Sequence, residues 1–144
     1  MRKSKVFLGG TYNESTWRDK LISLLKIDYF NPVVDDWTEE CMIEERRQRV
    51  ICDYVLYVIT PLMTGVYSIA EAVDDSNKRP KSTIFCFLEE DYEKALNENG
   101  YLLKKFDYGQ IKSLNQVGEM VKRNGGHYFR DLMSVAEFLN EGAE

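Results

Sequence analysis

The sequence has few of the residues on which metal and thiol chemistry depend. It contains a single histidine, His127, and three cysteines, none of them in a CxxC spacing. An odd number of cysteines without a repeated spacing is typical of reduced thiols in the cytoplasm. A zinc site, a Cys–His pair or a Ser–His–Asp triad would have to use His127. We interpret His127 as a surface or loop residue, predict no metal and no cofactor, and expect any catalysis to rest on carboxylates, tyrosines and backbone dipoles.

Long apolar stretches and clusters of positive charge are also missing. The apolar run at residues 6–8 is too short for a signal peptide, and two glycines follow it. No segment approaches the roughly 20 apolar residues that a membrane span needs. The net charge is -5, and the basic cluster at residues 46–49 lies beside two glutamates. Because nucleic-acid binding needs clustered positive charge, we expect a cytoplasmic protein that binds neither nucleic acid nor a membrane.

Short apolar runs alternate with amphipathic segments along the 144 residues. We predict strands at residues 5–8, 29–34, 54–59, 83–88 and 102–106, and helices at residues 15–26, 38–51, 67–76, 92–99, 110–123 and 131–140. The run at 54–59 is apolar on both faces, as in a buried parallel strand. This alternation predicts an α/β fold: one doubly wound domain over residues 1–144, with a parallel sheet of four to five strands flanked by helices.

The loops that follow the strands are the candidates for a binding site. Right-handed crossovers bring the carboxyl ends of parallel strands to one edge, where ligands of such sheets bind. The first of these loops begins with Gly9 and Gly10. The two glycines either let the backbone approach a ligand closely or form a tight turn, and they match neither GxGxxG nor a P-loop.

Two glutamates have both a structural and a functional interpretation. Glu71 lies three residues after Ser68, so the pair could form a capping box at the start of a helix. Alternatively, Glu71 is a carboxylate at the pocket end of that helix. Glu45 lies in the middle of a helix beside arginines, where surface ion pairs are common. Ser15 is the expected N-cap of the first helix. Local sequence does not decide between these interpretations.

Four segments, in this order and spacing, resemble the nucleoside 2-deoxyribosyltransferase-like family over about residues 5–90. They are VFLGGT at 6–11 with STWR at 15–18, the Asn31-Pro32 pair, CDYVLYVI at 52–59, and TGVYSIAE at 64–71. Residues 91–144 show no such resemblance, and we expect them to complete the domain with helices.

The resemblance implies a flavodoxin-like fold and an enzyme that cleaves the N-glycosidic bond of a nucleoside or (deoxy)nucleotide, as a transferase or a hydrolase. In the family a glutamate attacks C1′ through an oxocarbenium-like transition state and forms a covalent (deoxy)ribosyl-enzyme. Glu71 matches this nucleophile, and Glu45 falls near an assisting carboxylate. The resemblance also implies a homo-oligomer. The positions expected to bind substrate are Gly9, Gly10, Thr11, Tyr12, Trp37, Gly65 and Ser68.

Three departures from the family pattern keep other functions open. Phe7 stands where classical transferases carry a tyrosine that contacts the nucleophile, Thr64-Gly65 where they carry an aspartate, and Ala72-Val73 where they carry Leu-Gly. These departures suit a hydrolase better than a base-swapping enzyme, and they also suit a non-catalytic nucleotide-binding or sequestering protein. An NAD-cleaving glycohydrolase is a third possibility, because it too uses a glutamate on a helix near a serine.

Overall fold

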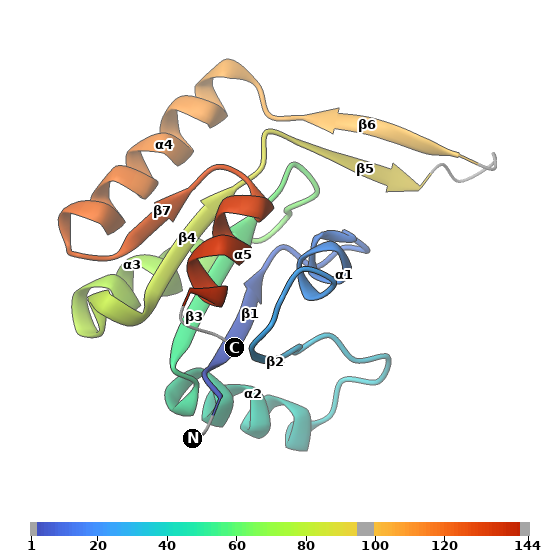
Figure 1. Ribbon diagram of the computed structural model, residues 1–144. Helices are drawn as coiled ribbons and strands as arrows, with labels where there is room; N and C mark the ends of the chain where they lie inside the picture. The colour runs from blue at the N-terminus through green and yellow to red at the C-terminus, as the bar shows by residue number, and fades with distance from the viewer. Residues whose placement is uncertain (1–2, 95–99, 142–144) are drawn as a thin grey trace.

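The parallel sheet that the sequence predicts is present in the structure, a computed structural model that describes residues 3–94 and 100–141. Within these residues, five parallel strands lie in the order β2-β1-β3-β4-β7 (Figure 1). Their bounds are β1 Lys5–Gly10, β2 Asp28–Phe30, β3 Tyr54–Ile59, β4 Thr83–Phe87 and β7 His127–Phe129. The α/β fold class is therefore confirmed, and the order is the flavodoxin-like one.

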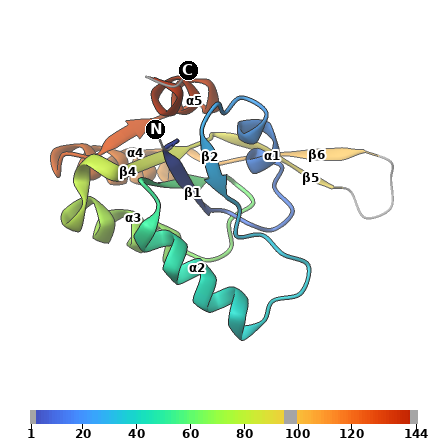
Figure 2. The ribbon, with the colours of Figure 1, turned by 60° about the horizontal axis from the view of Figure 1, so that its bottom comes forward.

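Helices cover both faces of the sheet. Two of them, α1 (Trp17–Ile22) and α5 (Leu132–Asn140), share one buried cluster with alternate residues of the strands. The helices α3 (Tyr67–Lys78) and α4 (Tyr108–Arg123) share the cluster on the opposite face. Helix α2 (Glu39–Ile51) lies beside α3 on that second face (Figure 2). Because β1 and β3 are covered on both sides, nearly all their side chains are buried, as parallel strands require.

The first helix and the second strand are shorter than predicted. Helix α1 begins after Thr16, which makes no side-chain cap, so the expected N-cap at Ser15 is wrong. The Ser15 hydroxyl donates a hydrogen bond to Asp91 at 2.6 Å and accepts a longer one from the backbone N–H of Trp17 at 3.4 Å. Strand β2 ends at Phe30, before Pro32, and it lies at the edge of the sheet. A proline has no N–H for a ladder, and an edge strand is where that loss is tolerated.

The predicted helix at residues 92–99 is wrong in its described part. Residues Glu90–Lys94 form β5, which pairs antiparallel with β6 (Tyr101–Lys105), and residues 95–99 lie outside the described part of the chain. The two strands form a separate hairpin that extends from the sheet (Figure 1). Cross-strand partners such as Tyr92 and Leu103 override the local helical preference of this charged segment. The strand predicted at 102–106 is confirmed, although it lies outside the parallel sheet.

His127 lies in a strand rather than in a loop, which corrects the prediction for this residue. It begins β7, a three-residue edge strand that pairs with β4 opposite Ile84. Its ring packs on Phe138 with 4.3 Å between ring centroids. A strand of only three residues, which follows two glycines, has too little periodicity to be predicted from the sequence.

In the described part of the chain, no helix is both long and apolar enough to cross a membrane.

Candidate active site

A cleft of about 270 Å³ opens at the carboxyl ends of β1 and β3. The chain leaves β1 toward β2 on one side and returns to β3 on the other, so the cleft lies where the strand order reverses. This is the place where open parallel sheets bind ligands. The predicted site residues that line it are Gly9, Gly10, Thr11, Tyr12, Glu45, Gly65, Ser68 and Glu71. The structure therefore brings these predicted residues together in one cleft.

Trp37 is the predicted site residue that the structure does not bring into the cleft. It is 56% exposed and lies in the connection between β2 and α2. Because β2 ends at Phe30, this connection runs outward from the sheet edge before α2 begins (Figure 1). The expectation that Trp37 lines the pocket is therefore not met in this structure.

The two glycines that end β1 are required by packing as well as by the cleft. A Cβ on Gly9 would approach the ring of Tyr57 to 2.9 Å. Gly10 has a φ of +118°, and a Cβ there would collide with the backbone of Val58. Both glycines therefore let β1 lie close to β3, and both line the cleft.

Hydrogen bonds join the loops on either side of the cleft. The backbone N–H of Thr60 donates to the Thr11 hydroxyl at 2.9 Å. The Asn13 amide donates to the carbonyl of Leu62 at 2.7 Å and to the hydroxyl of Thr64 at 3.1 Å. Asn13 has a φ of +46°, a left-handed conformation that asparagine tolerates better than most residues. Sequence reasoning missed Asn13, although an asparagine in a loop three residues after a glycine pair is a signal for such a turn.

The side chains of Trp17 and Arg18 hold the end of β1 and the first loop in place through hydrogen bonds. Strand β2 pairs with β1 only as far as Phe7, and the buried Arg18 donates to three carbonyl groups at and beyond that point. The acceptors are Leu8 at 3.0 Å, Gly10 at 3.3 Å and Thr11 at 2.7 Å. Arg18 therefore replaces the missing length of β2 as a hydrogen-bonding partner.

Tyr12 lies over this arginine at the rim of the cleft. The Arg18 guanidinium is 4.5 Å from the centroid of the Tyr12 ring, a cation–π distance. Burial raises the pKa of Tyr12 to about 12, with Glu45 adding to the rise. Burial lowers the pKa of Arg18 to about 10, still well above neutrality. At neutral pH, Tyr12 is therefore a protonated hydroxyl beside a charged guanidinium.

Glu71 and Glu45 face the same cleft from different helices. Burial raises the pKa of Glu71, and the charges of Glu45 and Asp75 add to the rise, whereas Arg49 opposes it. Burial also raises the pKa of Glu45, opposed by Arg18. Glu44 points elsewhere and pairs with the exposed Arg47 at 2.7 Å, so the predicted surface ion pair belongs to Glu44. The site thus holds two carboxyl groups that bind protons more readily than exposed ones.

The capping box that competed with a functional role for Glu71 does not form. Helix α3 has its N-cap at Val66 and no side-chain cap, so Ser68 lies inside the helix. The backbone N–H groups of Ile69 and Ala70 bond to the Val66 carbonyl. The Glu71 carboxylate pairs with Arg49 of α2 at 3.2 Å.

In the described residues, no group of three or more His, Cys, Asp or Glu side chains could hold a metal ion.

The fold and the cleft define a doubly wound α/β domain with two carboxyl groups at its ligand-binding edge. A family model described as "Nucleoside 2-deoxyribosyltransferase like" matches residues 3–92, which is more than half of the chain and includes both glutamates. The chain therefore belongs to the nucleoside 2-deoxyribosyltransferase-like family. Comparison with curated proteins and with solved structures finds no match. The family binds nucleosides, and membership suggests an enzyme with a glycosyl-transfer or hydrolase role.

Proposed function

We propose that this protein cleaves the N-glycosidic bond of a nucleoside or (deoxy)nucleotide, with Glu71 as the nucleophile. The observation that carries the proposal is that Glu71 and Glu45 line one cleft at the carboxyl ends of β1 and β3. A carboxylate suits this reaction because the transition state carries positive charge on the sugar. The reaction is a transfer if a second base accepts the sugar and a hydrolysis if water does.

The proposed chemistry divides between the two glutamates. A carboxylate oxygen of Glu71 attacks C1′ while the C1′–N bond breaks and its electron pair leaves with the base. Glu45, whose raised pKa favours a bound proton, gives that proton to the departing base. Water or an acceptor base then attacks C1′ and displaces Glu71 as a carboxylate. The proton lost by the attacking water or base returns to Glu45.

The lining of the cleft favours a substrate without a phosphate. Among the described residues that line it, none is a lysine or an arginine, and two are glutamates. A 5′-phosphate would face these negative charges without a counter-ion in the lining. The hydroxyls of Thr11, Thr64 and Ser68 suit the neutral oxygens of a sugar instead. An uncharged nucleoside is therefore our preferred substrate.

The test is release of free base from a panel of deoxynucleosides, ribonucleosides, their 5′-monophosphates and NAD, followed by liquid chromatography. We expect one nucleoside to lose its base. Glu71→Gln should stop base release, and Glu44→Gln, a change on an exposed side chain, should leave base release unchanged. Added acceptor base then separates transfer from hydrolysis. Release of nicotinamide alone would favour an NAD-cleaving enzyme, and activity that survives Glu71→Gln would exclude Glu71 as the nucleophile.

A non-catalytic nucleotide-binding protein is the second candidate. The observation that favours it is Phe7, which lines the cleft where the resemblance places a tyrosine hydroxyl next to the nucleophile. If calorimetry detects nucleoside or nucleotide binding while a folded protein releases no base from any member of the panel, this second function replaces the first.

We also propose that the protein is a homo-oligomer, since Tyr101 and Tyr108 are largely exposed. A cytoplasmic location is proposed from the three free cysteines. Sedimentation of the full chain tests the oligomeric state.

A further inference from the structure

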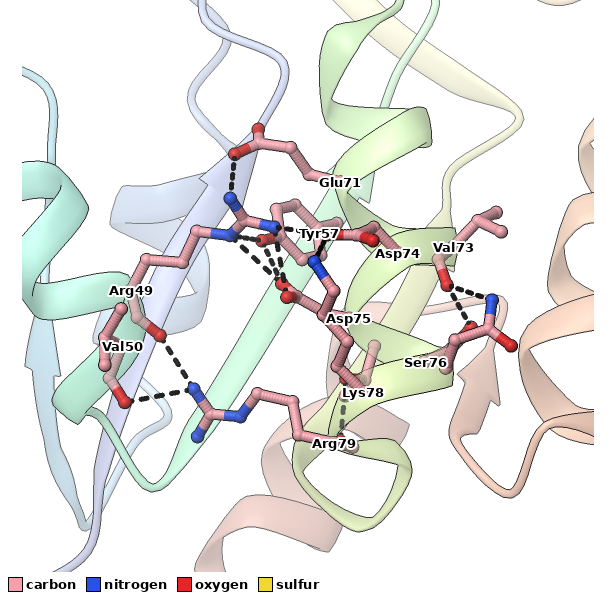
Figure 3. A network of polar contacts seen from close by, with 12 residues as sticks. Arg49, Val50, Tyr57, Glu71, Val73, Asp74, Asp75, Ser76, Lys78 and Arg79 are labelled. Atoms are coloured by element: carbon pink, nitrogen blue, oxygen red, sulfur yellow. Dashed lines mark hydrogen bonds and ion pairs between the residues drawn. The ribbon is translucent and has the colours of Figure 1, made fainter.

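A network of polar contacts lies behind Glu71, outside the residues assigned so far to substrate or chemistry (Figure 3). We propose that Arg49 is the positioning residue of the site: its guanidinium anchors one oxygen of Glu71 and leaves the other free to attack C1′. The proposal rests on Glu71 being the nucleophile. It differs from the assignments above because Arg49 does not line the cleft and acts only through Glu71.

The guanidinium of Arg49 is held from its other side. Its Nε and Nη2 atoms donate to the two carboxylate oxygens of Asp75 at 3.1 and 3.0 Å. The Nε atom also lies 2.9 Å from the hydroxyl of Tyr57, which itself donates to Asp75 at 2.6 Å. The Asp75 side chain is only 8% exposed, and Tyr57 is fully buried in β3. A two-pronged pair of this kind fixes the plane of the guanidinium as well as its place.

The remaining nitrogen of the guanidinium, Nη1, points at Glu71. It lies 3.2 Å from Oε2, and the second carboxylate oxygen points away from Arg49 (Figure 3). Glu71 and Asp75 are four residues apart and therefore share one face of α3. Arg49 reaches between them from α2, so the three side chains can be held together only when the two helices are packed. This arrangement fixes the Glu71 carboxylate at one oxygen.

The same contact opposes the forces that would protonate Glu71. Burial raises the pKa of Glu71, and Glu45 and Asp75 raise it further, while Arg49 lowers it. A nucleophile must be ionised, so Arg49 supports both the charge and the orientation that attack requires. The charged and titratable groups that act on Glu71 come from the first loop, α2, β3 and α3, and are Tyr12, Glu45, Arg49, Tyr57 and Asp75.

Two substitutions with opposite expected effects test the electrostatic part. Arg49→Met removes the favourable charge and should raise the pKa of Glu71 by about 1–3 units. Glu45→Gln removes a repelling charge without touching the contacts of Arg49 and should lower it. The readout is the titration of ¹³C-labelled glutamate carboxyls by NMR in the full-length protein, with Glu71→Gln identifying the signal. Arg47→Met, the same change on an exposed residue of α2, is the matched control and should leave the Glu71 titration unchanged.

The positioning part shows in the pH profile of base release. At pH values below the Glu71 pKa of the unchanged protein, kcat/KM of Arg49→Met should be about tenfold lower for each unit by which the substitution raises that pKa. Two units above the raised pKa, ionisation is restored, and kcat should still be about 10- to 100-fold below that of the unchanged protein, because the carboxylate is no longer held. KM should change less than kcat. Arg49→Lys keeps the charge without the planar fork and should recover the pKa but only part of kcat.

The outcomes separate this inference from the proposed function. If the unchanged protein releases no base, the proposed function fails, and the NMR titration still shows whether Arg49 governs Glu71. If base release requires Glu71 but kcat of Arg49→Met recovers fully at high pH, positioning by Arg49 is wrong. A pKa of Glu71 that moves the same way in Arg49→Met and Glu45→Gln would also overturn it. If Arg49→Met does not fold, Arg49→Lys still gives the kcat deficit, and the neutral Arg49→Gln gives the sign of the shift.

Discussion

Arg18 gives a direct test of how the first loop of the cleft is held in place. Its guanidinium occupies the position beside β1 that a longer β2 would have filled, because β2 pairs with β1 only as far as Phe7. Arg18→Met keeps an unbranched side chain of similar length but removes every donor. We expect the substitution to destabilise the fold and to loosen Tyr12, whose ring lies over the guanidinium at 4.5 Å.

The size of the effect follows from the carbonyl groups that lose a donor. The Thr11 carbonyl keeps the indole N–H of Trp17 at 2.9 Å. The carbonyls of Leu8 and Gly10 lose the hydrogen bonds that Arg18 makes to them at 3.0 and 3.3 Å. A buried acceptor left without its partner costs about 1–3 kcal/mol, so two cost about 2–6 kcal/mol of unfolding free energy. That is a large part of the stability of an ordinary domain, which is about 5–15 kcal/mol.

Urea unfolding and thermal melting, both followed by circular dichroism, measure this loss. For a chain of this size, each kcal/mol lowers Tm by roughly 2–4 °C, so a fall of at least about 4 °C is expected. Lys20→Met, on the exposed side of α1, is the control and should stay within about 0.5 kcal/mol. If Arg18→Met unfolds at the same urea concentration as the unchanged protein, with the same slope, Arg18 does not replace the missing length of β2.

Three further predictions concern the cleft itself. Glu45→Gln should lower kcat/KM for nucleosides by about 10²–10⁴-fold, and much less for a substrate whose base leaves without a proton, as steady-state kinetics would show. Gly10→Ala should destabilise the protein by at least about 1–3 kcal/mol in urea unfolding, because its positive φ and the Val58 backbone exclude a Cβ. The raised pKa of Glu71 means that its ionisation opposes folding as pH rises through that value. Glu71→Gln should therefore be at least as stable as the unchanged protein at neutral pH, and the difference should shrink in melts at acidic pH.

The sheet was predictable because its strands are apolar on both faces. The strand Tyr54–Ile59 has the predicted bounds, and the helix that precedes it begins at Glu39, one residue after the predicted start, and ends at the predicted Ile51. Burial on two sides leaves a signal in the sequence that does not depend on distant partners. The hairpin had no such signal: Glu90–Lys94 is charged and locally suits a helix, and only antiparallel pairing with the nearby strand Tyr101–Lys105 makes it a strand.

The location of the cleft was predictable for a topological reason, whereas its supporting residues were not. Loops that follow parallel strands share one edge, so Gly9, Gly65 and Glu71 could be grouped without coordinates. Arg49 carries no comparable signal, since it lies in a helix where four of five consecutive positions around it are charged. Its partners come from β3 and α3, and only the packing of these elements selects it from its neighbours.

Tyr57 shows how a residue of the core can also belong to the site. In the sequence it is one aromatic residue of a buried strand, and its ring does pack against the glycine that begins the cleft. Its hydroxyl, however, reaches the far side of that core and joins Asp75 and Arg49 at 2.6 and 2.9 Å. One rigid side chain therefore packs against Gly9, which lines the cleft, and also supports Glu71 through Arg49. Because a phenylalanine would satisfy the packing alone, the hydroxyl at this position is explained only by the network that holds the carboxylate.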